Sequence, residues 1–406
     1  DIDPLHAATR SSLELIYAEG AHQMEIAGIL EPIYQAGEEW ERLARLLEAK
    51  VDLFTEPGEK LEVVHHLADI YENRLGSIES AFAWLARGLL LAHEDERTAE
   101  ELDRLAHILP QGWEELTRTY AQILTTVEAG DIKLRAGRKL AHIYEEQIGD
   151  AERTQQVWEH LLEVDGNDPE VLGALDRIYQ VTLAWERLSQ ILARRVEVEG
   201  SKDERVELLT RLGRLHLGDL GDMPGAEKAF RRIIDQLAVP HLPALEGLEQ
   251  IYGQTGEWPK LYDVYKMQVD AVMGDAARSE VYAKMALLAA DALERPAEAV
   301  GLWQKVLDIR GEEAEPLRSL AVLHELLELW TDLDATLERL VHIVDQDQER
   351  TGIFLKIGEI RHDRLEKSSD ALDAYQQVLD IDFANLEALR RRAAIFAERS
   401  EWDDLI

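Results

Sequence analysis

The chain contains no cysteine among its 406 residues. Disulfide scaffolds, cysteine-ligated zinc or iron–sulfur sites and thiol nucleophiles are therefore excluded.

Basic residues are scarce beside acidic ones: 44 Lys and Arg face 81 Asp and Glu, for a net charge of −37. Binding to phosphates depends on clustered Lys and Arg, so we expect no nucleic-acid partner and no binding to an anionic membrane surface. No apolar run reaches the roughly 18 residues that span a bilayer, which predicts no membrane insertion. The first residues, Asp1-Ile2-Asp3-Pro4, lack the basic and apolar parts of a signal peptide. They do not indicate a compartment.

Enzymatic motifs are also missing. The sequence has no glycine-rich phosphate loop, no Gly-x-Ser-x-Gly elbow and no His-Glu-x-x-His helix. Carboxylate pairs such as Glu38-Glu39 are expected from composition alone. We therefore predict that the chain is not an enzyme and has no catalytic residues, no cofactor and no metal site.

What the sequence does contain is a long internal repeat. Six of its nine tryptophans are spaced by 73, 72, 73, 72 and 72 residues: Trp40, Trp113, Trp185, Trp258, Trp330 and Trp402. A leucine follows each of them three residues later, and further apolar residues follow at seven and eleven. These offsets lie along one face of an α-helix, which predicts that each tryptophan belongs to a helix of the same kind.

Two further series keep the same period. The remaining tryptophans alternate with other aromatics at equivalent positions: Trp84, Trp158, Phe230, Trp303 and Tyr375. Small residues form the other series: Ala68, Ala141, Gly213, Ala286 and Gly358. Because all nine tryptophans fall on two repeat positions, we predict that they are core residues rather than ligand-stacking residues.

Each repeat of about 72 residues is expected to form four helices, with about 22 in the chain. Around Trp258, for example, we expect helices at 242–252, from 258, at 276–293 and from 296. Asp168-Pro169 and the Ser201–Glu204 spacing are typical of helix starts. Gly76, Gly149 and Gly221 fall at equivalent hairpin turns. Strand signals are nearly absent, which predicts an all-α fold.

The sequence resembles tetratricopeptide repeats, in which each unit of about 34 residues is a helical hairpin. Ala68/Tyr71 and Ala141/Tyr144 match the small residue and tyrosine of that family's first helix, and Ala226/Phe230 matches its second helix. The resemblance implies a right-handed α-solenoid of stacked antiparallel hairpins in one continuous array. Its approximate units are 22–93, 94–166, 167–238, 239–311 and 312–384, with partial units at both ends. Half-a-tetratricopeptide and clathrin-type repeats remain alternatives.

The resemblance further implies a groove lined by the first helices. The outward positions expected to line it are His65, Asp69, Glu72, Arg138, His142, Glu145, Arg214, Asp291, Glu359 and His362. Such a polar surface fits a protein or peptide partner with basic residues, so we predict a non-catalytic scaffold for protein–protein interaction. The alternative reading is that these residues are merely the solvated face of the helices.

The ends of the chain support two other functions. Trp402 and Leu405 open a repeat helix close to the last residue, Ile406, so we expect the natural protein to continue or a partner to cover the ends. The chain would then be an architectural subunit of a large assembly, which includes self-association through the ends. It could equally be the targeting arm of an enzyme whose catalytic domain lies outside these residues.

Overall fold

A computed structural model describes residues 7–238 and 240–399. Helices α1 to α22 and two short π-helical segments make up all the regular structure of this described part, which contains no strand. The predictions of an all-α fold and of about 22 helices are therefore confirmed.

Contacts group the chain into two compact units, Asp1–Val198 and Glu199–Ile406, and each unit is described by itself. The first contains α1 (Ala7–Ala18), α2 (Gln23–Ala36), α3 (Trp40–Leu53), α4 (Pro57–Asn73), α5 (Ile78–Leu91), α6 (Glu96–Ile108), α7 (Gly112–Thr126), α8 (Gly130–His142), η1 (Ile143–Ile148), α9 (Ala151–Val164), α10 (Pro169–Val181) and α11 (Trp185–Val198). The second contains α12 (Lys202–Leu217), α13 (Met223–Arg231), η2 (Arg232–Gln236), α14 (Leu242–Thr255), α15 (Trp258–Ala271), α16 (Asp275–Asp291), α17 (Pro296–Arg310), α18 (Ala314–Leu326), α19 (Trp330–Ile343), α20 (Asp347–Asp363), α21 (Ser368–Ile381) and α22 (Leu386–Arg399). One continuous array and a right-handed superhelix stay predictions.

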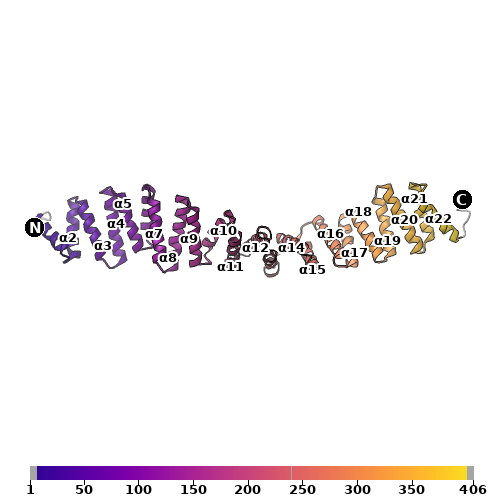
Figure 1. Cartoon of the computed structure of the whole chain (residues 1–406), viewed down its shortest axis with the longest axis horizontal. Helices are drawn as coiled ribbons and strands as arrows, with labels where there is room; N and C mark the ends of the chain where they lie inside the picture. The colour runs from indigo at the N-terminus through magenta and orange to yellow at the C-terminus, as the bar shows by residue number, and fades with distance from the viewer. Residues whose placement is uncertain (1–6, 239, 400–406) are drawn as a thin grey trace. The chain divides into compact units, whose positions relative to one another are not determined.

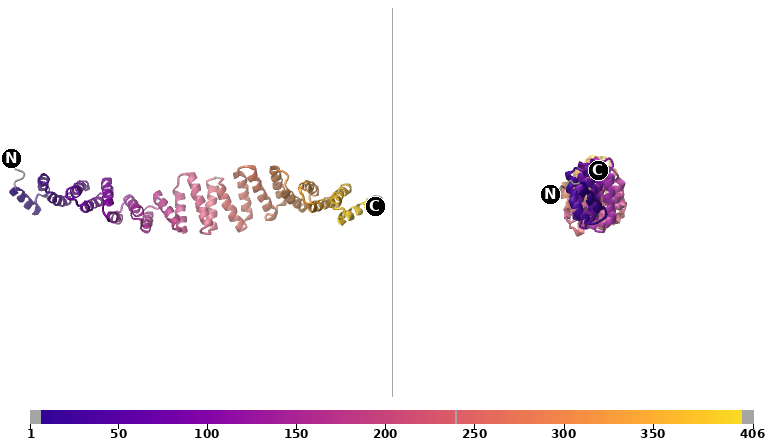
Figure 2. Two further views of the ribbon diagram at one scale, coloured as in Figure 1. Left: turned by 90° about the horizontal axis from the view of Figure 1, so that it is seen from above. Right: turned by 90° about the vertical axis from the view of Figure 1, so that its left-hand side faces the viewer.

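Within each unit, consecutive helices form antiparallel hairpins. The pairs α2/α3 to α10/α11 and α12/α13 to α20/α21, with the exception of α6/α7, contact each other more extensively than they contact their other neighbours. Each hairpin also packs on the next one in its unit (Figure 1). The antiparallel pairs from α12 to α17 are plain in the turned view of Figure 2. We call the even-numbered helices from α2 onward first helices and the odd-numbered ones from α3 onward second helices. No helix of the described part is both long and apolar enough to cross a membrane.

The helix starts follow the local sequence. Asp168 caps α10, its Oδ1 accepting hydrogen bonds of 3.0 Å from the backbone N–H groups of Glu170 and Val171. Ser201 caps α12 by accepting a 3.4 Å bond from Glu204. Both predicted starts are confirmed, and such caps satisfy amides that the helix leaves unpaired.

The hairpin turns adopt left-handed backbone conformations. Gly76, Gly149 and Gly221 have φ of +66°, +75° and +64° at the predicted turns. The same turn in the next two repeats has glutamate in that conformation, at Glu294 (+55°) and Glu366 (+58°). A side chain there brings Cβ close to the following carbonyl oxygen, so these two turns are strained where the glycine turns are not.

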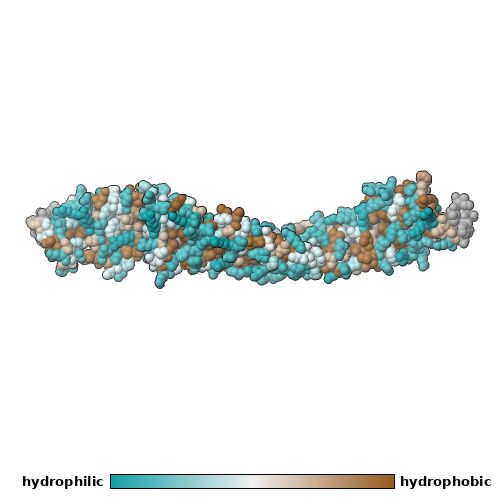
Figure 3. All heavy atoms as spheres, in the orientation of Figure 1, coloured by the Kyte–Doolittle hydropathy of each residue, from teal (hydrophilic) through white to brown (hydrophobic). Residues whose placement is uncertain are grey.

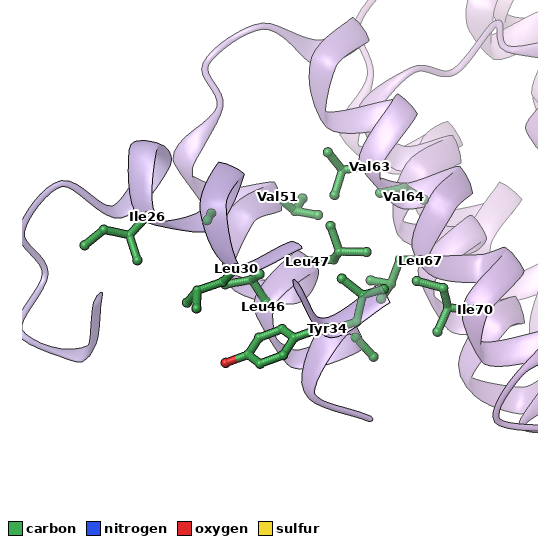
Figure 4. Close-up of a cluster of buried hydrophobic side chains, with 13 residues drawn as sticks. Ile26, Leu30, Tyr34, Leu46, Leu47, Val51, Val63, Val64, Leu67 and Ile70 are labelled. Carbon is green, nitrogen blue, oxygen red and sulfur yellow. The ribbon is translucent and has the colours of Figure 1, made fainter. Parts of the chain in front are cut away.

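The core lies between successive hairpins. Figure 4 shows Leu30 and Tyr34 of α2, Leu47 of α3 and Val64 and Leu67 of α4 in one buried cluster. These side chains come from three consecutive helices, so one hairpin buries its apolar face on the first helix of the next.

The two tryptophan series differ in burial. In the series that begins at Trp84, the residues Trp158, Phe230, Trp303 and Tyr375 are 1%, 1%, 3% and 1% exposed, which confirms them as core, whereas Trp84 itself is only partly buried. The prediction is wrong for the other series: Trp40, Trp113, Trp185 and Trp330 are only partly buried, and Trp258 is 37% exposed.

Position in the helix explains the difference. Trp40 and Trp330, for example, are the first residues of α3 and α19, beside a turn rather than in the middle of the stack. The guanidinium carbons of Arg74 and Arg364 lie 4.8 and 4.6 Å from their ring centroids, which stabilises the exposed ring faces by cation–π interaction. Trp402 and Leu405 lie outside the described residues.

Candidate interaction surface

The ten residues predicted to line a groove all lie on first helices or their continuation. His65, Asp69 and Glu72 are on α4, Arg138 and His142 on α8, and Glu145 on η1; Arg214 is on α12, Asp291 on α16, and Glu359 and His362 on α20. Nine of them are exposed or partly exposed. The prediction that they form a binding groove stays a prediction.

His65 is the exception, because it does not face outward. Its side chain is buried, with Nε2 3.2 Å from the hydroxyl of Thr98 and 3.5 Å from Oδ2 of Asp95. It therefore connects α4 to the start of α6 and cannot line a groove. Although burial opposes the effect, the hydrogen bonds from Thr98 lower the pKa of Asp95 below its usual value.

In the first unit, charged side chains connect each first helix to the next. Glu72 accepts two hydrogen bonds of 2.6 Å from Arg104, which joins α4 to α6. Asp103 pairs with Lys139, which joins α6 to α8. We call this series of contacts the ion-pair ladder. The sequence analysis missed Arg104, Asp103 and Lys139, although all lie about one hairpin away from their partners.

The ladder continues from α8 to α10 and brings two predicted residues together. Arg138 Nε and His142 Nε2 lie 2.9 and 3.6 Å from the carboxylate of Glu170, and Arg138 also pairs with the capping Asp168. Glu145 lies 3.8 Å from Arg177. These contacts bring Arg138 and His142 together around one acid. Asp69, by contrast, accepts a 2.8 Å hydrogen bond from Asn73 of the same helix, α4.

The second unit has a comparable ladder, made of pairs joining successive first helices: Glu249–Lys284 at 2.7 Å, Glu325–Lys356 at 2.7 Å and Asp363–Arg391 at 3.3 Å. The predicted residues of this unit are not brought together, because α12, α16 and α20 are each separated by another hairpin. His362 contacts Ser368 at 3.2 Å and Glu398 at 3.6 Å. Asp291 is exposed, and no Lys, Arg or His nitrogen of residues 7–238 or 240–399 lies within salt-bridge distance of it.

The ladder leaves most of the negative charge uncompensated. Exposed ion pairs of this kind contribute about 0.2–1 kcal/mol each, so they add little to the stability of the fold. With 81 acids and 44 Lys and Arg, even complete pairing would leave many carboxylates without a cation. The first-helix surface therefore presents ordered charges within an excess of negative charge.

A second recurring contact joins each of three hairpins to the preceding helix. Tyr34 donates a 2.8 Å hydrogen bond to Glu14, which Arg42 also contacts at 3.3 Å. Equivalent clusters are Tyr179–Glu159–Arg187 and Tyr252–Glu227–Lys260. Burial, followed by the bond to Glu14, raises the pKa of Tyr34 to about 12. The sequence contains a signal for these clusters: a tyrosine lies six residues before each of these tryptophans and a cationic residue lies two residues after it.

Hollows lie elsewhere on the first unit. One, of about 660 Å³, lies between α5 and α7 and is lined by residues that include Phe82, Ala86, Leu90 and Leu109. Another, of about 700 Å³, lies beside α9 and α10. No group of three or more His, Asp or Glu in the described part is arranged to hold a metal ion.

Comparison with known proteins gives a structural likeness only. No protein family and no curated protein matches the sequence. Among solved structures, YrrB, described as a TPR protein with an unusual peptide-binding site, is 14% identical over 50% of this chain and 97% of its own, with a TM-score of 0.31. The C-terminal part of a TPR repeat-containing protein from Cytophaga hutchinsonii is 13% identical over 64% of this chain and 98% of its own, with a TM-score of 0.31. The APC/C hetero-tetramer Cut9–Hcn1 is 11% identical over 96% and 86%, with a TM-score of 0.24.

Two of these neighbours are described as TPR proteins, and the present chain has a TPR-like helical-repeat fold. At such low TM-scores, that description rests on the chain's own features: paired antiparallel helices, turns at equivalent positions, and a small residue against a buried aromatic at Gly213/Phe230 and Gly358/Tyr375.

Proposed function

We propose that the chain is a non-catalytic scaffold for protein–protein interaction, which binds a segment rich in Lys or Arg through its first helices. The observation that carries the proposal is the ion-pair ladder: charged side chains connect several successive first helices in each unit, and the chain has 81 acids for 44 Lys and Arg. An extended basic segment would meet several carboxylates along such a surface. The outward residues Asp69, Asp291 and Glu359 are part of this proposed surface.

Fluorescence anisotropy with a labelled octapeptide of alternating lysine and serine tests the proposal. Binding should weaken at least about tenfold as NaCl rises from about 50 to about 500 mM, because salt screens exposed charges. A peptide of alternating glutamate and serine should not bind. Binding that is insensitive to salt, or equal for the two peptides, would contradict a basic partner.

A matched pair of variants tests which surface is used. Asp291→Lys changes a first helix and Asp308→Lys changes the following second helix, α17, and both replaced side chains are exposed. Both substitutions change the net charge equally, so general attraction would fall equally in both. The proposal requires the Asp291 variant to bind the lysine peptide more weakly than the Asp308 variant.

An architectural role is the second candidate, and the stacking of hairpins favours it because further hairpins can add to such a stack. Sedimentation velocity over a wide concentration range distinguishes it. Concentration-dependent assembly supports the architectural subunit, and a constant monomer rules out self-association under those conditions.

A further inference from the structure

The turn between α10 and α11 exposes apolar side chains that folding does not explain. Val181 is 82% exposed and Leu183 is 62% exposed. Leu183 also has φ of +56°, a left-handed conformation that is unfavourable for a side chain of this kind. Three of the equivalent turns have Glu38, Gly256 and Glu328 in this conformation. A strained and exposed leucine costs stability on both counts, which is a pattern found at binding sites.

A hollow of about 700 Å³ lies next to this turn. Val181 and Ile178 of α10 line it together with Ala151 and Thr154 of α9. All of these residues belong to the first compact unit. Figure 3 shows a small brown, hydrophobic patch on the surface near the place that α10 has in Figure 1. The hollow is comparable in size to sites that enclose small ligands or a few side chains of a partner.

Negative charge borders the apolar surface. Glu145 and Glu152 line the hollow, and Glu186 is exposed just after the turn. Arg177 also lines the hollow, and it lies 3.8 Å from Glu145. Glu152 accepts a 3.3 Å hydrogen bond from Gln156, and no Lys, Arg or His nitrogen among the described residues is within salt-bridge distance of it. A second copy of this acidic chain would bring the same charges to the contact, so like-charge repulsion disfavours self-association here.

We propose that the hollow and the α10–α11 turn bind an amphipathic segment of another protein. One aliphatic or aromatic side chain of that segment enters the hollow against Val181 and contacts Leu183, and flanking Lys or Arg residues face Glu145 and Glu152. This proposal rests on the proposed function as a scaffold. Its surface meets the ladder at Glu145 and Arg177 and extends from there to the hollow and the α10–α11 turn. It also explains why leucine is present at a turn where glycine would be less strained.

The probe is the peptide acetyl-Gly-Lys-Leu-Leu-Lys-Gly-amide, titrated into the full chain with ¹³C-labelled Ile, Leu and Val methyl groups. The methyl resonances expected to shift when the peptide binds are those of Val181, Leu183 and Ile178.

Two variants test the same surface. Leu183→Gly relieves backbone strain and Val181→Ser changes an exposed side chain, so both variants should fold. Each should weaken binding at least tenfold, the effect of about 1.4 kcal/mol. Peptides with Ser for Leu, or with Glu for Lys, should bind at least tenfold more weakly.

The same turn in the second unit provides matched controls. Leu326→Ser and Glu328→Gly change the equivalents of Val181 and Leu183, and both should leave peptide binding unchanged. The proposal is overturned if these controls weaken binding as much as the α10–α11 variants, or if Leu183→Gly and Val181→Ser bind normally. Dimerisation of the unliganded chain that Leu183→Gly abolishes would assign the turn to a second copy and also overturn it.

The outcome separates this proposal from the proposed function. If Asp291→Lys weakens binding of the lysine–serine peptide while Leu183→Gly leaves binding of the apolar peptide unchanged, the scaffold proposal stands and this one fails. If both variants bind their peptides normally, both proposals fail.

Discussion

The ring of Phe230 lies between two glycines. Replacing either glycine by alanine tests whether close packing around this ring outweighs the gain in helix propensity. The ring is only 1% exposed on α13. A Cβ atom added at Gly213 of α12 would lie 2.4 Å from its Cε1, and one added at Gly247 of α14 would lie 2.4 Å from its Cε2. Three consecutive helices therefore approach one another around a single aromatic ring.

Two opposing effects decide the result of Gly213→Ala. Alanine is the better helix former by about 1 kcal/mol, which would stabilise the protein. Overpacking a well-packed core costs about 1–3 kcal/mol, because the ring has to leave its preferred position. We expect overpacking to dominate, with a net loss of up to about 2 kcal/mol. Gly247→Ala should behave in the same way.

The control is Gly301→Ala in α17, where an added Cβ would meet nothing within 4 Å. There only helix propensity changes, so the variant should be stabilised by about 0.5–1 kcal/mol. Stacked hairpins need not unfold in one step, so urea unfolding should be combined with amide hydrogen exchange. In the exchange experiment, Gly213→Ala should lower the protection of backbone amides in α12 to α14. Phe230→Leu should reduce the penalty of Gly213→Ala in a double-mutant cycle. The reasoning is refuted if Gly213→Ala stabilises the protein as Gly301→Ala does.

Three further predictions concern the turns, the aromatic series and pH. Replacing the strained Glu294 by glycine should stabilise the protein by about 0.5–1 kcal/mol, whereas Gly149→Ala should destabilise it by about 1–2 kcal/mol; urea unfolding checks both. Trp158→Ala should cost about 3–5 kcal/mol and Trp258→Ala about 1 kcal/mol, and equal losses in thermal unfolding would contradict the assigned burial. Because the folded pKa of Asp95 lies below its unfolded value, its contribution to stability is present above the usual aspartate pKa of about 3.9 and is lost as pH falls through the folded pKa. Asp95→Asn should therefore lower stability at neutral pH and flatten its acid dependence, as measured by unfolding at a series of pH values.

Helix positions around Trp258 were predictable to within a few residues. The expected helices at 242–252 and 276–293 are Leu242–Thr255 and Asp275–Asp291 in the structure, and the one expected from 296 begins at Pro296. Apolar periodicity and helix-start residues are local signals, and they repeat in every unit. They were strong enough here because several copies of each signal could be compared.

The candidate surface was less predictable, as His65 shows. Its spacing on α4 placed it on the outward face, but a side chain on the next first helix, Thr98 of α6, covers it. The partners of Glu72 and Arg138 are likewise about one hairpin away in the sequence. Which of several charged residues meets a given partner depends on the rotation and offset between neighbouring hairpins, and the repeat period does not specify either.

The order of residues was sufficient to establish an all-α chain of hairpins, because the recurring aromatic and small residues can be buried together only when equivalent helices stack. Packing between neighbouring hairpins decided which rings are buried, so that Trp158 is enclosed while Trp258, at the start of its helix, is partly exposed. It also decided which charges are paired, and it placed Val181 in the lining of a hollow on the surface. The physical reason is that helical periodicity acts within one helix, whereas burial and pairing depend on contacts between helices.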